Sequence, residues 1–166
     1  EALGKLFGNP DGAEMIEAAA AATKAGDREL CRLAAEQIAE RYLEDPDLEA
    51  RMMAVLALTG LKEKSVAPRI ARLLDETEPL MRDAVLSALG QIGDKRSAAA
   101  VARFLKDEST EIREIAAGAL GMIVGREWNP DPGLAVAEAV AWWEKNKDDP
   151  AYRPADDPKP EPKKGK

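Results

Sequence analysis

The sequence predicts an all-α protein built from stacked pairs of helices. Similar segments recur along the chain at a spacing of 31 residues, as Arg51, Arg82 and Arg113 illustrate. Within each segment the apolar residues are three and four positions apart, which is the period of a helix with one buried face. No segment has the apolar-polar alternation or the β-branched runs that indicate a strand. The chain of 166 residues is long enough for one domain with a substantial core.

The repeat is clearest in the first helix of each pair. The matching segments are residues 49–58, 80–89 and 111–120. Each has an arginine at its third position and a leucine at its last: Arg51 and Leu58, Arg82 and Leu89, Arg113 and Leu120. Glycine-containing turns then lead into a second apolar helix. Pro68 falls in the first turn of one second helix, where a missing N–H is tolerated.

The chain before and after these segments is predicted to form a leading pair and a closing helix. In the leading pair the turn falls at Gly26, and Asp27 is the expected N-cap of the second helix. In the closing helix Asp131 is the expected N-cap and Pro132 the first helical residue. The four expected pairs occupy about residues 13–43, 47–74, 78–105 and 109–147.

The last segment, residues 148–166, differs in composition from the rest of the chain. Five prolines alternate there with Asp, Lys and Glu. Such a segment has too few apolar residues to form a core of its own. We therefore expect a disordered or extended C-terminal tail.

The composition excludes several classes of enzyme and of membrane protein. The chain has no histidine and one cysteine, Cys31, which we expect to be a small buried residue. Most hydrolytic triads and most zinc, non-haem iron and haem sites need an imidazole, so the composition excludes them. Carboxylate-only magnesium or calcium sites and paired-carboxylate glycosidase chemistry stay possible. The carboxylate clusters lack the spacing of a calcium loop, and we expect no cofactor, no metal and no catalysis. No stretch approaches the roughly 20 apolar residues that span a bilayer. The net charge of −7 opposes binding to nucleic acid.

The first residue, Glu1, leaves the compartment open. The chain is either trimmed or a mature protein that has lost a signal peptide. We expect a soluble protein, either cytoplasmic or exported to the periplasm. The abundance of alanine favours a bacterial source.

Two segments resemble the short HEAT repeat of the phycobilisome-lyase type. They are residues 89–94, LGQIGD, and residues 101–105, VARFL. The resemblance extends over residues 45–125, with a degenerate repeat before it and an atypical one after it. One repeat departs from the pattern, because Lys62 and Glu63 stand where a Gly-Asp turn is expected. The chain is thus similar to bacterial HEAT-repeat proteins.

This resemblance implies a right-handed α-solenoid, in which stacked pairs share a core that no single pair can form. In the family, the first helices form the convex side and the second helices form the concave side. The concave side usually holds a partner. The resemblance therefore implies a binding surface on the second helices. It gives almost no information about the ligand.

Two sets of arginines have different expected roles. We expect Arg51, Arg82 and Arg113 to be structural, because each follows an acidic loop and its planar fork suits carboxylates and helix-end carbonyls. A second set lies on the second helices, opposite their apolar side, and is predicted to form a basic stripe that binds a partner. Its members are Arg41, Arg69, Arg72, Arg103 and Lys106. A merely solvated face is the alternative interpretation of this stripe.

The two adjacent tryptophans of the closing helix cannot both enter one core, because neighbours on a helix point about 100° apart. Trp143 continues the apolar positions Val136 and Val140, so we expect it to seal the last repeat. Trp142 is expected to be partly exposed and is a candidate contact for a partner. Trp128 is expected to pin the preceding loop to the last pair.

These observations favour a non-catalytic scaffold or accessory subunit of a larger complex. The expected binding surfaces are the concave face, the closing helix and the tail. One alternative is an enzyme accessory of the chromophore-lyase kind, which would need a large pocket. A less favoured alternative is a HEAT-repeat protein that binds nucleic acid in a basic groove.

Overall fold

The computed structural model describes residues 12–75 and 78–154. The α-helices of this part of the chain are α2 (Gly12–Ala25), α3 (Arg28–Tyr42), α4 (Leu48–Leu61), α5 (Ala67–Arg72), α6 (Pro79–Ile92), α7 (Ala98–Ala102), α8 (Thr110–Val124) and α9 (Pro132–Asn146). The described residues contain no strand, and the prediction of an all-α protein is confirmed. Residues 155–166 of the predicted tail lie outside the described residues.

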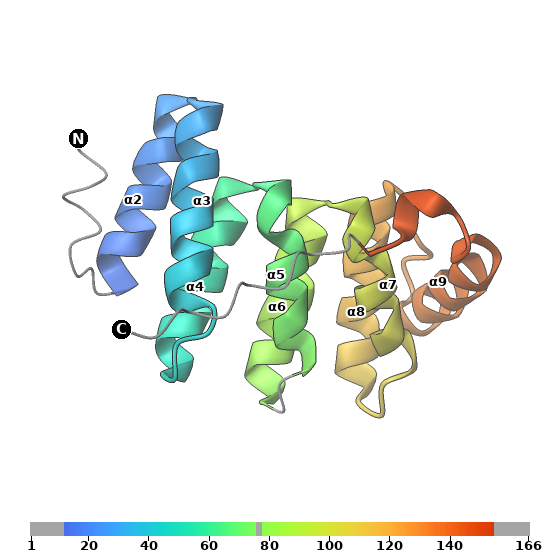
Figure 1. The fold of residues 1–166 in the computed structure, drawn as a ribbon. Helices are drawn as coiled ribbons and strands as arrows, with labels where there is room; N and C mark the ends of the chain where they lie inside the picture. Colours follow the sequence, from blue (N-terminus) through green and yellow to red (C-terminus); the bar gives the residue numbers. More distant parts are fainter. Residues whose placement is uncertain (1–11, 76–77, 155–166) are drawn as a thin grey trace.

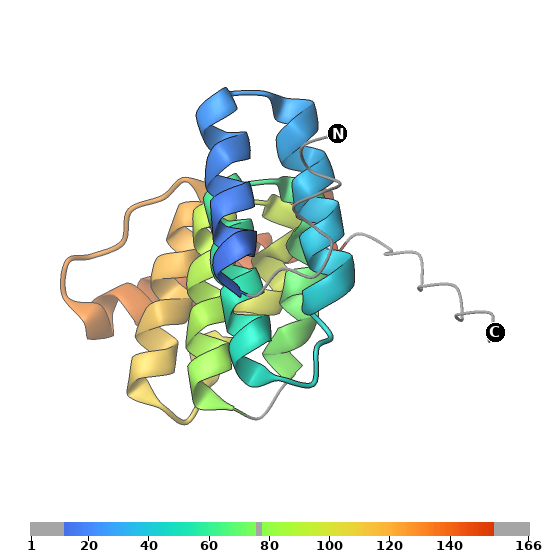
Figure 2. The same cartoon turned by 90° about the vertical axis from the view of Figure 1, so that its left-hand side faces the viewer.

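The helices stack as successive pairs into an α-solenoid (Figure 1). The first helices α2, α4, α6 and α8 pack side by side in one layer. The second helices α3, α5 and α7 form the other layer, as the view along the stack shows (Figure 2). The closing helix α9 crosses α8 steeply instead of running antiparallel to it (Figures 1 and 2).

Two of the second helices are short and continue as 3-10 turns at both ends. The turns η1 (Lys64–Val66) and η2 (Leu73–Asp75) flank α5, and η3 (Lys95–Ser97) and η4 (Arg103–Lys106) flank α7. Pro68 lies in the first turn of α5, as predicted. A further turn, η5 (Pro150–Tyr152), follows α9, so the chain keeps regular structure beyond the predicted start of the tail.

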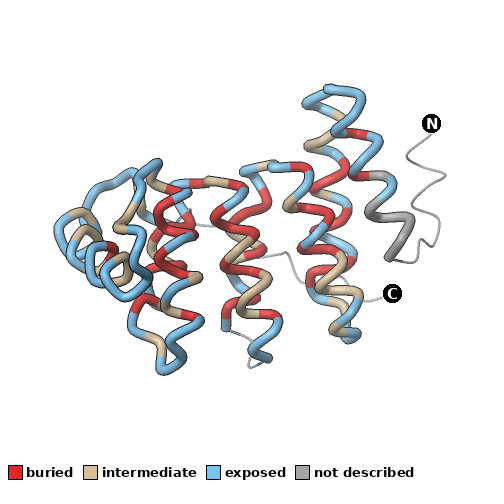
Figure 3. Tube along the Cα trace, turned by 180° about the vertical axis from the view of Figure 1, so that it is seen from behind, coloured by how far each residue is buried: buried red, intermediate tan, exposed pale blue. Residues whose placement is uncertain are grey.

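The core is a continuous strip between the two layers, coloured red in Figure 3. The repeated leucines Leu58, Leu89 and Leu120 are all 0% exposed. Many of the other core residues are alanines, which lets neighbouring helices approach closely. Because the same apolar position recurs in each pair, successive pairs extend one shared core.

The ends of the helices follow the turn chemistry of the sequence. Asp27 and Asp131 are confirmed as N-caps, since their side chains accept hydrogen bonds from backbone N–H groups of α3 and α9. Gly93 and Gly125 end α6 and α8 in the left-handed conformation, each with φ of 69°. α4 ends in the same conformation at Lys62, with φ of 52°.

Two glycines on the first helices sit at points of very close approach. A Cβ atom on Gly90 of α6 would lie 2.8 Å from the Cα of Ala119 in α8. The equivalent position in the last repeat is Gly121, where a Cβ atom would lie 2.7 Å from Nε1 of Trp128 and from the carbonyl oxygen of Arg126. The missing side chain therefore lets α8 pack closely at Gly90. At Gly121 it lets the loop after α8 pack closely instead.

Trp128 fixes that loop to α8, as the sequence suggested. Its indole N–H donates a hydrogen bond of 2.7 Å to the carbonyl oxygen of Ala117, which also gives the buried N–H a partner. The loop thus covers part of α8, on the side where a further repeat would otherwise pack.

Adding a methyl group at the close contact between first helices should destabilise the protein. We expect Gly90→Ala to lower the free energy of unfolding by about 1–3 kcal/mol, because backbone atoms of α8 would have to move. Gly118→Ala is the matched control. A Cβ atom at Gly118 would meet no atom of a neighbouring element within 4 Å, so alanine should raise the free energy of unfolding by up to about 1 kcal/mol. Urea denaturation measures both, and equal effects of the two substitutions would contradict the packing argument.

Candidate functional site

The repeated arginines contact the loops that precede their own helices. Nη1 of Arg51 donates hydrogen bonds to the carbonyl oxygens of Asp45, at 2.7 Å, and of Pro46, at 3.2 Å. Nη1 of Arg113 makes the equivalent bonds, at 2.7 Å to the carbonyl oxygen of Asp107 and at 3.0 Å to that of the next residue. A guanidinium has several donors in a fixed geometry, so one side chain can satisfy two loop carbonyls.

Arg82 contacts the second helix of its own pair and the loop that follows it. Its Nη1 lies 3.9 Å from Oδ2 of Asp107, and its guanidinium carbon lies 5.7 Å from the centre of the Phe104 ring. These contacts link the first helix α6 to the second helix of the same pair and to the next inter-pair loop. We propose on this basis that all three repeated arginines are structural.

We call the surface formed by α3, by α5 with η2, and by α7 with η4 the second-helix face. The structure places every predicted cation of the basic stripe on these elements. Arg41 is exposed at the end of α3, Arg69 is half-buried on α5, and Arg72 is exposed at the end of α5. Arg103 and Lys106 are exposed on η4.

Arg103 and Lys106 have carboxylate partners among the residues that the structure describes. Nη2 of Arg103 lies 3.0 Å from Oδ1 of Asp75, and Nζ of Lys106 lies 3.0 Å from Oε1 of Glu144. Glu144 also pairs with Nζ of Lys147 at 2.6 Å. Hydrogen bonds from Lys147 and then Lys106 lower the pKa of Glu144, and its carboxylate in turn raises the pKa of Lys147.

The sequence pattern does not predict these ion pairs, because each carboxylate comes from another repeat. Asp75 is 28 positions from Arg103, and Glu144 is 38 positions from Lys106. The predicted stripe therefore includes cations that already pair with a carboxylate from another repeat. All four side chains are well exposed, so water and salt screen both ion pairs.

The two tryptophans of α9 belong to one aromatic cluster. The Trp142 ring lies 6.1 Å from Trp128 and 5.6 Å from Tyr152, measured between ring centres. Trp143 lies 6.1 Å from the same Tyr152 ring. Both tryptophans are half-buried, so Trp142, the predicted partner contact, has surroundings like those of Trp143. Tyr152 comes from the segment that we expected to be tail, and the pattern of helical repeats did not indicate its contacts.

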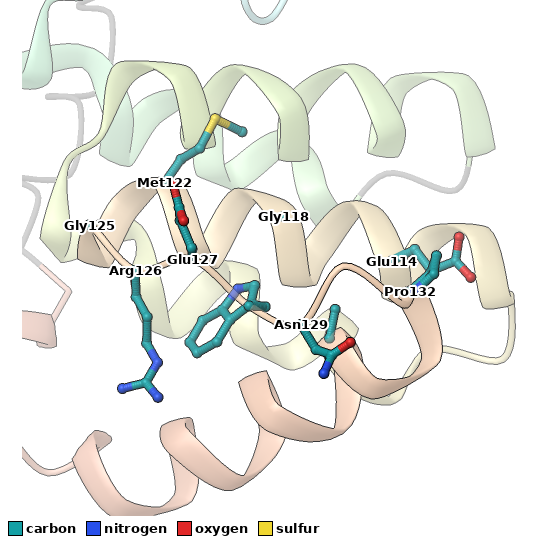
Figure 4. Close-up of a pocket in the computed structure, with 11 residues that line it drawn as sticks. Glu114, Gly118, Met122, Gly125, Arg126, Glu127, Asn129 and Pro132 are labelled. Carbon is teal, nitrogen blue, oxygen red and sulfur yellow. The ribbon is translucent and has the colours of Figure 1, made fainter.

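A groove of about 770 Å³ lies between α8 and the loop that leads to α9 (Figure 4). Gly118 and Met122 of α8 line it, together with Trp128 and Arg126 of the loop. Met122 is 53% exposed, and the guanidinium carbon of Arg126 lies 5.3 Å from the centre of the Trp128 ring. Sequence reasoning missed this groove, and the only sign of it was the interruption of the repeat by residues 126–132.

Cys31 is half-buried, whereas its apolar neighbours predicted a buried side chain. It lines a pocket between two inter-helix turns, which keeps part of the side chain accessible. In the part of the chain that the structure describes, no three cysteine or carboxylate side chains are placed to hold a metal ion. None of the helices in that part is long and apolar enough to cross a membrane.

Comparison with known protein families agrees with the stacked pairs. The family model described as HEAT repeats matches residues 35–121 and residues 70–150, which together cover more than half of the chain. These matches run from α3 to the start of η5. They include Gly90, where α6 and α8 approach closely. No match is found among curated proteins. The chain belongs to the HEAT-repeat family.

Proposed function

We propose that this protein is a non-catalytic scaffold that binds an acidic segment of another protein through its second-helix face. Repeat proteins of this architecture offer extended surfaces on which several repeats contact one partner. We further propose, from the resemblance of residues 89–94 and 101–105, that the repeats are of the short phycobilisome-lyase type and that the protein is bacterial.

The observation that carries this proposal is the gathering of cations from two successive pairs on one face. Arg69 and Arg72 come from α5, and Arg103 and Lys106 come from η4. The ion pair between Arg103 and Asp75 shows that η2 and η4 adjoin. The chain has a net charge of −7, so this surface has the opposite sign to the molecule as a whole. Such a local field attracts and orients an acidic partner.

The carboxylates that pair with Arg103 and Lys106 do not prevent binding. The side chain of Asp75 is 72% exposed and that of Glu144 is 44% exposed. Exposed ion pairs contribute about 0–1 kcal/mol, so carboxylates of a partner can replace them at little cost.

Charge reversal on the second-helix face should weaken partner binding. We expect the double variant Arg72→Glu with Arg103→Glu to bind at least about tenfold more weakly, which corresponds to about 1.4 kcal/mol. The partner is first obtained as the protein that copurifies with the native chain, and its affinity for each purified variant is then measured by calorimetry.

The matched control is Lys24→Glu with Lys62→Glu. It changes the net charge by the same amount on α2 and in the turn after α4, at two exposed residues outside the elements of the second-helix face. This variant should bind like the wild type. Equal affinities of wild type and the Arg72/Arg103 variant would exclude the second-helix face as the binding surface.

The ion pair that joins η4 to α9 should weaken in acid. The pKa of Glu144 is lowered in the folded state, so its contribution to stability is present above the unfolded pKa and is lost as the pH falls through the folded pKa. NMR titration should find that Glu144 titrates below the usual glutamate value of about 4.3. Lys147→Ala should raise this pKa more than Lys106→Ala does, because the Lys147 hydrogen bond is the larger cause. An unchanged pKa in Lys106→Ala would show that the pair joining η4 to α9 does not form in solution, and an unchanged pKa in Lys147→Ala would show the same of the pair at the end of α9.

A further inference from the structure

A pocket of about 520 Å³ lies where the α2–α3 turn meets the α4–η1 turn. Three cations, Arg28, Lys62 and Lys64, contribute to its lining, together with Glu63 and the thiol of Cys31. Arg28 is the first residue of α3, so the pocket lies at the opposite end of that helix from Arg41. The pocket is thus distinct from the cations of the second-helix face.

The α4–η1 turn departs from the repeat in a way that costs stability. Lys62 has a φ of 52°, whereas the equivalent residue one repeat later is Gly93, with φ of 69°. A side chain in the left-handed conformation is unfavourable, and glycine removes that cost. The fold therefore favours glycine at position 62, because the residue there caps α4 through its backbone N–H, which any residue other than proline supplies.

In the equivalent turn of the next repeat, the aspartate pairs with an arginine of the same turn. Asp94 is 5% exposed, accepts a hydrogen bond from the backbone N–H of Arg96 and pairs with its guanidinium at 2.8 Å. This pair raises the pKa of Arg96. Glu63 occupies the position of Asp94 but makes no capping hydrogen bond with its side chain.

The cations of the pocket are available to a ligand. Among the described residues, Arg28, Lys62 and Lys64 take part in no ion pair. With Glu63 they give the lining a formal charge of +2 in a molecule whose net charge is −7. A phosphate monoester has a charge of about −1.5 to −2 at neutral pH, which matches this lining.

We propose that this pocket binds a phosphate group, either as free phosphate or as a phosphomonoester. The guanidinium of Arg28 offers a planar fork of donors, and the two lysines offer mobile point charges, the combination that recognises phosphate oxygens. The volume of the pocket exceeds that of a phosphate ion, and Leu61 and Cys31 line part of it. That part can receive the organic portion of a monoester.

Cys31 makes the test direct, because it is the only cysteine in the chain and lines the pocket. We expect inorganic phosphate to slow the reaction of Cys31 with an anionic aromatic disulfide reagent in a saturable manner. Sodium chloride at equal ionic strength should protect much less, since it only screens charge. A neutral pyridyl disulfide reagent serves as a second probe that is insensitive to the field of the pocket.

Two substitutions test the cations. Lys62→Gly should weaken phosphate protection by about fivefold or more. The same substitution should raise the Tm by about 2 °C, because glycine relieves the left-handed backbone. Lys64→Gln should weaken protection by a similar factor. The control is Lys95→Gln, the equivalent lysine one repeat later, which lies outside the pocket and should leave protection unchanged.

A phosphoserine peptide and its unphosphorylated twin identify the source of the phosphate group. Stronger protection by the phosphopeptide than by inorganic phosphate assigns the site to a phosphorylated protein segment, and the reverse assigns it to a free anion. Both results support a phosphate site. Protection no greater than that given by sodium chloride, or equal protection in wild type, Lys62→Gly and Lys64→Gln, would overturn the proposal.

Discussion

Close contact between successive first helices is the interaction on which the rest of this structure depends. A single pair of helices cannot cover its own apolar face, so each pair needs a neighbour. At Gly90 the absence of a side chain lets α8 approach α6 until a Cβ atom would overlap the backbone of Ala119. The repeated leucines of the first helices are completely buried in the core that the stacked pairs share.

The same constraint explains the end of the solenoid. Gly121 repeats the position of Gly90, but Trp128 and the carbonyl group of Arg126 occupy the space beside it instead of another helix. Trp142 and Tyr152 then pack with Trp128 as an aromatic cluster that covers the last pair. Because a loop covers less surface than a helix, the groove beside Met122 stays open at this end.

Positions on the surface of the repeat can be substituted without disturbing the stack. Replacing the Gly-Asp turn by Lys62 and Glu63 leaves the stack intact, since that turn lies at its edge and contributes little to the shared core. The cations of η4 are likewise free to form contacts across repeats, with Asp75 and Glu144. Both proposed sites therefore lie on positions that the core does not constrain, and a substitution there changes the charge of a surface more than the stability of the fold.

The sequence by itself determined the helices, their caps at Asp27 and Asp131, and the recurrence of buried positions, because these depend on neighbours within a few residues of the chain. It also determined the absence of histidine chemistry. Only the tertiary structure decided which carboxylate reaches which cation, that Trp142 contacts Trp128 and Tyr152, and that Cys31 lines a pocket. Those contacts join residues from separate turns or distant segments, and their geometry follows from how the pairs stack, which no local pattern in the chain records.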